Sequence, residues 1–224
     1  MKKILLVCFM FFAVSAYAHA SAMQFVDRVA NRNLYIGIAV GAGGDDNFTG
    51  VSAISPGVSI SSSSSNAFFG LEAGFEAPVI GDHQWLGFRV NVNRHSEAKL
   101  TTRAGLNSNE IKNSIMTVPI TAYYKHFFNH SAFSIMGGAG ITFISSQWDF
   151  DTYISGSGLT STSFTESRIS PHLVFGAEHR FSPLFGLGLD FRYTFNAEMQ
   201  RDYLLQELKR DVSFVGTLTA RFYF

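Results

Sequence analysis

The chain has 224 residues, in which 17 Lys and Arg balance 17 Asp and Glu, and it is 46% hydrophobic but only 15% charged. This length suffices for one sizeable domain, and the low charged fraction is unlike that of a disordered chain. Balanced charge supplies no basic field for a phosphate backbone, so the composition argues against a nucleic-acid partner.

The N-terminus has the anatomy of a secretory signal peptide, predicted over residues 1–20. Two lysines precede an uninterrupted apolar run, and small residues at alternate positions allow cleavage after Ala18 or Ala20. Residues 21–33 are then a lead-in segment. The single cysteine, Cys8, falls in the leader, so the mature chain would have no disulfide and no thiolate metal site. The sequence predicts no cofactor.

The mature chain alternates between large apolar residues and small or polar ones, with the period of two that is typical of strands. In residues 34–43, for example, Leu34, Ile36, Ile38 and Val40 alternate with small residues and one tyrosine. Eight segments show this pattern: 34–43, 67–76, 86–93, 117–125, 133–143, 172–180, 187–194 and 213–224. The sequence therefore predicts an all-β protein of eight antiparallel strands.

The connections between these segments alternate in length, which predicts an up-and-down meander with long loops at one end only. Short turns follow every second strand, at 77–84, 127–132 and 182–186. The long polar connections are residues 45–65, 94–113, 146–165 and 196–209. We expect solvated loops there, while the apolar residues of 198–210 leave a helical turn or two open as an alternative.

The polar face of the strands carries four acids and five bases: Glu72, Glu76, Glu178, Asp190, Arg89, Lys125, Arg180, Arg192 and Arg221. A basic side chain facing lipid at mid-depth costs about 2–4 kcal/mol, so a membrane placement turns all of them into the lumen, where opposite charges can pair. Glycines crowd the same face, as suits a narrow lumen. A soluble barrel with its apolar face inward is the weaker alternative.

Aromatic residues gather towards the strand ends, where membrane barrels place interfacial girdles. The predicted girdle at the short-turn end comprises Phe75, Trp85, Tyr124, Phe127, Phe133, Phe181 and Phe222. The girdle at the other end comprises Trp148, Phe150, Tyr193 and Phe195.

Several motifs resemble those of small eight-stranded bacterial outer-membrane barrels, namely the OmpA-like transmembrane domain and the opacity-type surface proteins. They are the Gly-rich strand 35–43, the run 136–140, the motif 175–181 and the terminal Ala-Arg-Phe-Tyr-Phe of 220–224. The resemblance covers residues 34–224. It implies a multi-pass barrel in the bacterial outer membrane, with its termini in the periplasm and four long extracellular loops, in contact with lipid and lipopolysaccharide.

The end of the chain carries the most specific part of this resemblance. Family members end on an aromatic residue that the barrel-assembly machinery recognises, with a hydrophobic residue two positions earlier. Phe224 and Phe222 match this signal, whereas Thr219 stands where a glycine is usual. The resemblance thus implies the barrel-assembly machinery as a partner.

The resemblance implies a surface role for the loops: adhesion to host cells, evasion of host defences or support of envelope integrity. Host-cell surface or matrix proteins are then the expected partners. The candidate loop contacts are the aromatic residues Phe48, Trp148, Tyr153 and Phe164.

Two other functions stay open. The first is a narrow solute or ion pore along Glu72, Arg89, Glu178 and Arg192, although barrels of eight strands are just wide enough to be filled by side chains. The second is a lipid A-modifying enzyme, but alternation places His95 and Ser96 on opposite faces. No catalytic, cofactor or metal residue is predicted. Conductance in planar bilayers would reveal the pore, and a mass shift of lipid A the enzyme.

Overall fold

The computed structural model describes residues 34–43, 45–49, 58–63, 67–80, 83–128, 131–203 and 206–224. The predicted signal peptide (residues 1–20) and lead-in segment (residues 21–33) lie outside the described residues. None of the described residues forms a helix that is long and apolar enough to cross a membrane. The strands are β1 (Leu34–Ala42), β2 (Asp45–Thr49), β3 (Val58–Ser63), β4 (Ala67–Ile80), β5 (Gln84–His95), β6 (Ala98–Ala104), β7 (Asn107–Phe127), β8 (Phe133–Ile154), β9 (Gly158–Ser182), β10 (Phe185–Thr194), β11 (Glu198–Tyr203), β12 (Gln206–Asp211) and β13 (Phe214–Tyr223).

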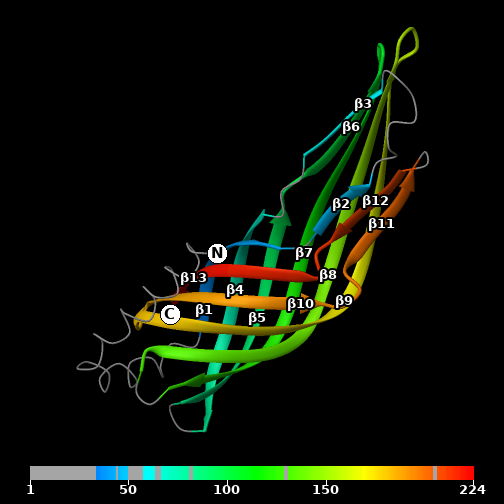
Figure 1. Cartoon of the computed structure of the whole chain (residues 1–224). Coiled ribbons are helices and arrows are strands. Elements are labelled where there is room, and N and C mark those ends of the chain that lie inside the picture. Colours follow the sequence, from blue (N-terminus) through cyan, green and yellow to red (C-terminus); the bar gives the residue numbers. More distant parts are fainter. Residues whose placement is uncertain are drawn as a thin grey trace.

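Eight of these strands form a closed antiparallel ring in the order β7-β5-β4-β1-β13-β10-β9-β8, and the pairing of β8 with β7 completes it. The first and last strands of the chain are neighbours, since β1 pairs with β13. Each of the eight predicted segments falls almost wholly within one strand of this ring. The predicted eight-stranded up-and-down barrel is therefore confirmed (Figure 1).

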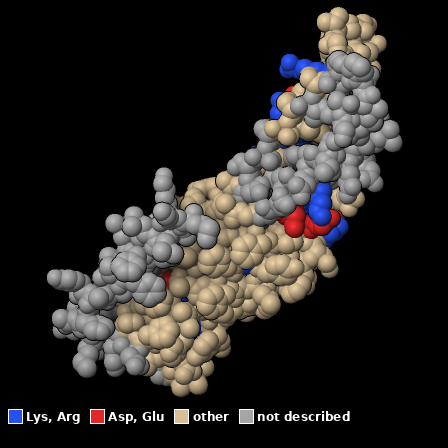
Figure 2. Space-filling model, viewed as in Figure 1, with Lys and Arg blue, Asp and Glu red and all other residues tan. Residues whose placement is uncertain are grey.

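The apolar face of the strands is the outer wall of the barrel. In β1, Ile36 and Ile38 are 54% and 48% exposed, whereas Tyr35 and Ala39, which point into the lumen, are 2% and 0% exposed. The visible barrel wall is almost wholly uncharged (Figure 2). Because the apolar side chains face outward and the charged ones inward, the alternative of a soluble barrel is wrong.

Three barrel strands are about twice as long as a membrane crossing requires. A membrane strand needs about 9–11 residues, and β10 has 10, but β7, β8 and β9 have 21, 22 and 25. Their distal halves continue beyond the ring with β6 and β3 as a sheet of order β3-β6-β7-β8-β9 (Figure 1). We call this sheet the extension. The end of the barrel from which it projects is the long-hairpin end, and the opposite end is the short-turn end.

The extension corrects the expectation of solvated loops. Much of residues 94–113 and 146–165 is paired strand, because the β7–β8 and β8–β9 ladders run on without interruption past the barrel. Residues 198–203 and 206–211 pair as strands β11 and β12, to which β2 adds a third strand, so the helical alternative there is also wrong. Both faces of these segments are largely polar, which hides the alternation that reveals a half-buried strand.

Two lumen glycines make room for tyrosine rings. Tyr35 is paired with Gly74, and Tyr123 with Gly87, across neighbouring strands. A Cβ at Gly74 would lie 2.3 Å from the Tyr35 ring, and one at Gly87 would lie 2.2 Å from the Tyr123 ring. Only glycine at these two positions therefore leaves room for the tyrosine rings.

The chain ends on the outer surface of the short-turn end. The Phe224 N–H donates to the Leu34 carbonyl at 2.9 Å, which ties the last residue to the start of β1. Phe222 and Phe224 are 44% and 60% exposed on the apolar wall.

Candidate functional site

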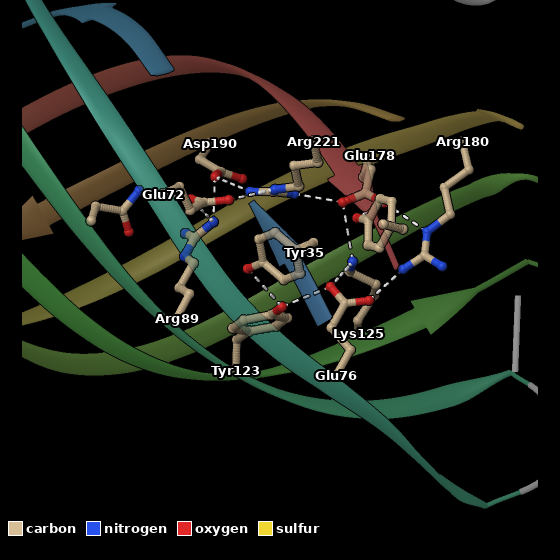
Figure 3. Close-up of polar contacts among 12 residues, drawn as sticks. Tyr35, Glu72, Glu76, Arg89, Tyr123, Lys125, Glu178, Arg180, Asp190 and Arg221 are labelled. Carbon is tan, nitrogen blue, oxygen red and sulfur yellow. Dashed lines mark hydrogen bonds and ion pairs between the residues drawn. The ribbon is translucent and has the colours of Figure 1, made fainter. Parts of the chain in front are cut away.

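The lumen charges form a connected network at whose centre lies Arg221 of β13 (Figure 3). Its Nε donates to Glu72 at 2.6 Å, Nη1 to Glu178 at 2.5 Å and Nη2 to Asp190 at 2.9 Å. One guanidinium therefore joins acids from β4, β9 and β10. All four side chains are buried, so each charge depends on the others for the solvation that water would otherwise give it.

Two further bases extend the network towards the short-turn end. Lys125 of β7 bonds Glu76, and its Nζ also donates to Glu178 at 3.1 Å. Arg180 of β9 bonds Glu76 through Nη2 and Glu178 through Nε, the latter at 3.0 Å. The side chains of these four residues are at most 1% exposed, so no described carboxylate or base on this level faces open solvent.

Aromatic rings surround Arg180 and close this level of the lumen. Its guanidinium carbon lies 3.8 Å from the ring centroid of Tyr223, 5.2 Å from that of Phe127 and 5.7 Å from that of Trp85, as in cation–π contacts. Trp85 and Phe127 are 1% and 6% exposed. The sequence-based assignment of these two residues to the outer girdle is therefore wrong. Trp85 lies an even number of residues from Arg89 in β5, and Phe127 lies two residues from Lys125 in β7, so strand alternation turns both side chains into the lumen.

Arg89 of β5 completes the network towards the long-hairpin end. Its Nη1 donates to Asp190 at 2.5 Å and to Glu72 at 3.4 Å. The Asn91 side-chain amide donates to the same Glu72 oxygen at 2.7 Å. Asp190 thus receives hydrogen bonds from two guanidinium groups, those of Arg89 and Arg221.

Three tyrosines supply neutral donors to the acids. Tyr223 donates to Glu178 at 2.6 Å and Tyr123 to Glu76 at 2.7 Å, while the hydroxyl groups of Tyr35 and Tyr123 lie 3.1 Å apart. The sequence analysis did not include these tyrosines or Asn91 in the network. The sequence signal for them is that they alternate in phase with the charged or small residues of the same strands, which places them on the lumen face. A tyrosine in a strand is, however, equally typical of a membrane girdle.

The structure joins eight of the nine predicted lumen residues in ion pairs and leaves Arg192 apart. Arg192 of β10 is 8% exposed, and among the described residues no carboxylate lies within ion-pair distance of it. Its Nε has no hydrogen-bond partner. The lumen therefore contains four acids that are paired with four bases, and a fifth base that is not paired.

The extension has a small apolar core of its own. Leu100 of β6, Ile111 of β7, and Trp148 and Phe150 of β8 pack together and are 1–2% exposed. Two earlier assignments of Trp148 are therefore wrong, since it is neither a girdle residue nor a side chain available to a partner. Strand alternation persists beyond the barrel and turns Trp148 and Phe150 towards the inner face of the extension.

The tips of the extension expose apolar side chains. Tyr153 and Phe164, two of the candidate contacts, are 44% and 40% exposed, and Phe164 packs edge-on against Phe150 with ring centroids 5.7 Å apart. The backbone of Phe48 lies in β2, but its side chain lies outside the described part of the structure. Leu106 and Leu159, which are 79% and 67% exposed, were not among the predicted contacts. In the sequence, each of these leucines follows a glycine, Gly105 or Gly158, within an otherwise polar segment, and this pattern could have identified them.

One edge of the extension is open along β9. As far as the structure describes the chain, residues 158–167 pair only with β8, and the pairing of β9 with β10 begins at His172. This ten-residue segment contains no Lys and no Pro, and Glu166 is its one charged residue. It lacks the features by which most proteins protect an edge strand from further pairing.

A ladder of charges holds the strands of the extension together. Glu110 of β7 bonds Lys99 at 2.8 Å and Lys112 at 2.9 Å, and Lys112 bonds Asp151 of β8 at 3.4 Å. Hydrogen bonds from Lys99 and Lys112 hold the pKa of Glu110 below its ordinary value of 4.5. Ser161 of β9 donates to Asp151 at 2.6 Å, which lowers the pKa of that carboxyl.

His95 and Ser96 do not form a catalytic pair. His95 is buried in the lumen, where its Nε2 lies 3.4 Å from the Thr117 hydroxyl and its ring lies beside Phe68. The Ser96 hydroxyl instead donates to the Ala67 carbonyl at 2.9 Å. Among the described residues there is no group of three His, Cys, Asp or Glu that could hold a metal ion.

A closed antiparallel ring of eight strands, with an apolar wall and charges paired inside, defines the class of the small transmembrane β-barrels. The sequence profile of the outer membrane protein beta-barrel domain matches residues 4–209. The chain belongs to this family, and its location is the bacterial outer membrane.

Solved structures similar to this chain come from the same class. Ail, the attachment invasion locus protein of Yersinia pestis, is 13% identical over 86% of this chain and 97% of its own, with a TM-score of 0.47. OprG from Pseudomonas aeruginosa is 11% identical over 86% and 96%, with a TM-score of 0.48. Neisserial surface protein A is 15% identical over 85% and 97%, with a TM-score of 0.43. No curated protein matches the sequence.

Proposed function

We propose that this protein is a non-enzymatic surface protein, whose barrel anchors the extension and whose extension binds host-cell surface or matrix proteins. Outer-membrane barrels have short periplasmic turns and longer extracellular connections. In this orientation the extension faces the cell exterior, and the short-turn end, where β1 begins and β13 ends, faces the periplasm. The apolar wall contacts lipid and lipopolysaccharide, and the exposed Phe222 and Phe224 serve the barrel-assembly machinery.

The observation that carries this proposal is the open edge of β9. An extended peptide can add to such an edge through main-chain hydrogen bonds, and side chains next to the edge then determine which peptide is preferred. Phe164 lies within the edge segment, and Leu159 lies near its tip; both side chains are exposed. Most native proteins protect an edge of this length, so an unprotected one at the far end of the molecule supports a binding role.

The packing of the lumen supports a scaffold rather than a pore. The four charged residues of the network nearest the short-turn end, Glu76, Lys125, Glu178 and Arg180, bond one another and have side chains at most 1% exposed. Moving an ion past them would require these buried pairs to separate.

The proposal is tested by displaying the chain on a non-adherent bacterium and measuring the binding of cultured host cells and matrix proteins. One variant carries Leu106→Ser, Leu159→Ser and Phe164→Ser. A matched control carries Leu184→Ser, which is 50% exposed in the turn between β9 and β10, at the opposite end of the barrel.

We expect binding by the original chain and the control, and at least a tenfold loss by the triple variant. Surface exposure and the heat-dependent shift in gel mobility verify that each barrel has assembled. Equal binding by the triple variant and the control would reject the extension as the binding surface, and absence of binding by the original chain would reject adhesion itself.

A further inference from the structure

Among the described residues, Arg192 is the only inward-facing Lys or Arg of the barrel strands that has no carboxylate within ion-pair distance. The two acids closest to it along the lumen pair with other bases, since Asp190 Oδ2 accepts from Arg89 and Arg221 and Glu72 accepts from the same two bases. The other oxygen of Asp190, Oδ1, has no hydrogen-bond partner and is directed at Gly176 rather than at Arg192, because a Cβ at Gly176 would lie 2.2 Å from it. A buried charge without a counter-charge is strongly disfavoured.

The neighbours of Arg192 towards the long-hairpin end are polar but uncharged. The inward-facing side chains of this level include Asn93, Thr117, Thr121, Thr142, His172 and Thr194. Both ring nitrogens of His172 lie 2.9 Å from threonine hydroxyls, those of Thr121 and Thr142. None of these six side chains is an acid, and the residues paired directly with Arg192 are the buried Val174 and Val215. The missing negative charge is therefore not supplied from this side of Arg192.

The lumen around Arg192 is less tightly closed than the part nearer the short-turn end. Arg192 keeps 8% of its surface accessible to solvent, and Thr217 and Asn91, which pair with Asp190 and Glu72, keep 9% and 6%, whereas Lys125 and Glu178 nearer the short-turn end keep none. Thr217 of β13 is a diagonal neighbour of Arg192, because Arg192 is paired with Val215. Its hydroxyl is a second donor beside the unpartnered Nε of Arg192.

We propose that Arg192 holds a small monovalent anion, such as chloride, inside the lumen. The anion supplies the fifth negative charge and balances four acids and five bases. The site takes a single-atom halide and not a bulky organic anion, because only a few per cent of the surrounding side-chain surface is accessible. This inference concerns the barrel and is independent of the binding role of the extension.

Crystals of the full barrel soaked in bromide provide the direct test, since anomalous scattering locates bromide without reference to activity. We expect an anomalous peak within hydrogen-bonding distance of the Arg192 guanidinium. A well-ordered lumen without such a peak, or an Arg192 that has turned to pair with Asp190, would overturn the proposal.

A measurement in solution uses the stability of the barrel as its readout. Chloride replaces gluconate at constant ionic strength, and unfolding is followed for the original chain, for Arg192→Gln and for Arg103→Gln, an exposed arginine of β6 that serves as the matched control. Chloride at ten times its dissociation constant should favour the folded original chain and the control about tenfold. Arg192→Gln should show no such shift. An equal chloride effect in all three proteins would place the anion elsewhere, and if Arg192→Gln did not fold, the bromide experiment on the original chain would decide alone.

Discussion

At the level of single residues, Glu178 accepts hydrogen bonds from more elements of the lumen than any other acid described. Arg221 and Tyr223 reach it from β13, Lys125 from β7, and Arg180 from its own strand. Removal of one partner from a buried ion pair typically costs about 3–5 kcal/mol, because the charges left behind stay buried.

We therefore expect Glu178→Ala to lower the free energy of unfolding by about 3–5 kcal/mol, measured by urea titration of the refolded barrel in detergent. Glu97→Ala is the matched control, because Glu97 is exposed between β5 and β6. Unfolding midpoints that are the same for both variants would show that the lumen network does not hold the barrel together.

The glycines of the lumen wall give a second prediction. Gly87→Val would place its side chain within the Tyr123 ring, and overpacking of this kind costs about 1–3 kcal/mol. Gly137→Val is the control, since a Cβ at Gly137 meets nothing within 4 Å. We expect a lower refolding yield and urea midpoint for the first variant only, and equal values for the two would show that Tyr123 moves aside without cost.

At the residue scale, most of what could be predicted follows from the alternation of side chains along each strand. It assigns all nine charged residues to the lumen, because a period of two fixes the face on which each side chain lies. This alternation does not predict which charges pair. That depends on the stagger between strands that are distant in sequence, such as β4 and β13, whose Glu72 and Arg221 meet through the closure of the ring.

At the level of elements, the sequence predicts the eight barrel strands but not the extension. A barrel strand has one face in lipid and one in the lumen, so its alternation is strong, whereas the distal parts of β7, β8 and β9 are largely polar on both faces. Their Ser- and Thr-rich sequence is typical of loops. What keeps them extended is the continuing ladder with their neighbours, a long-range contact that composition does not reveal.

The charge ladder of the extension predicts a pH effect confined to this element. The pKa of Glu110 is lowered in the folded state, so its stabilising effect is complete above its ordinary value of 4.5 and is lost as the pH falls through the lowered value. The pairs are partly exposed, so we expect about 0.2–1 kcal/mol for each.

Trp148 reports on this element, because it is buried in the core of the extension and Trp85 is the only other tryptophan. In a Trp85→Phe background, we expect the urea midpoint of Trp148 fluorescence to be lower at pH 3 than at pH 6. Glu110→Gln should abolish most of this difference, whereas Glu97→Gln should preserve it. A difference that persists in Glu110→Gln would show that the ladder does not carry the pH dependence.

At the level of the whole molecule, the two parts of the chain have different chemistry. The barrel has an apolar wall and a lumen of paired charges that are closed to solvent near the short-turn end. The extension has exposed tips, an open edge along the described part of β9 and a charge ladder that a fall in pH can weaken. This division predicts that the extension can be removed while the barrel still assembles.

The most direct test compares a bacterium that displays the full chain with one that displays a trimmed chain, in which short turns replace residues 98–113, 147–165 and 198–211. The measurement is the binding of cultured host cells and matrix proteins, with assembly of both barrels verified by surface labelling. We predict binding by the full chain and none by the trimmed chain. Equal binding by two assembled barrels would contradict the assignment of function to the extension.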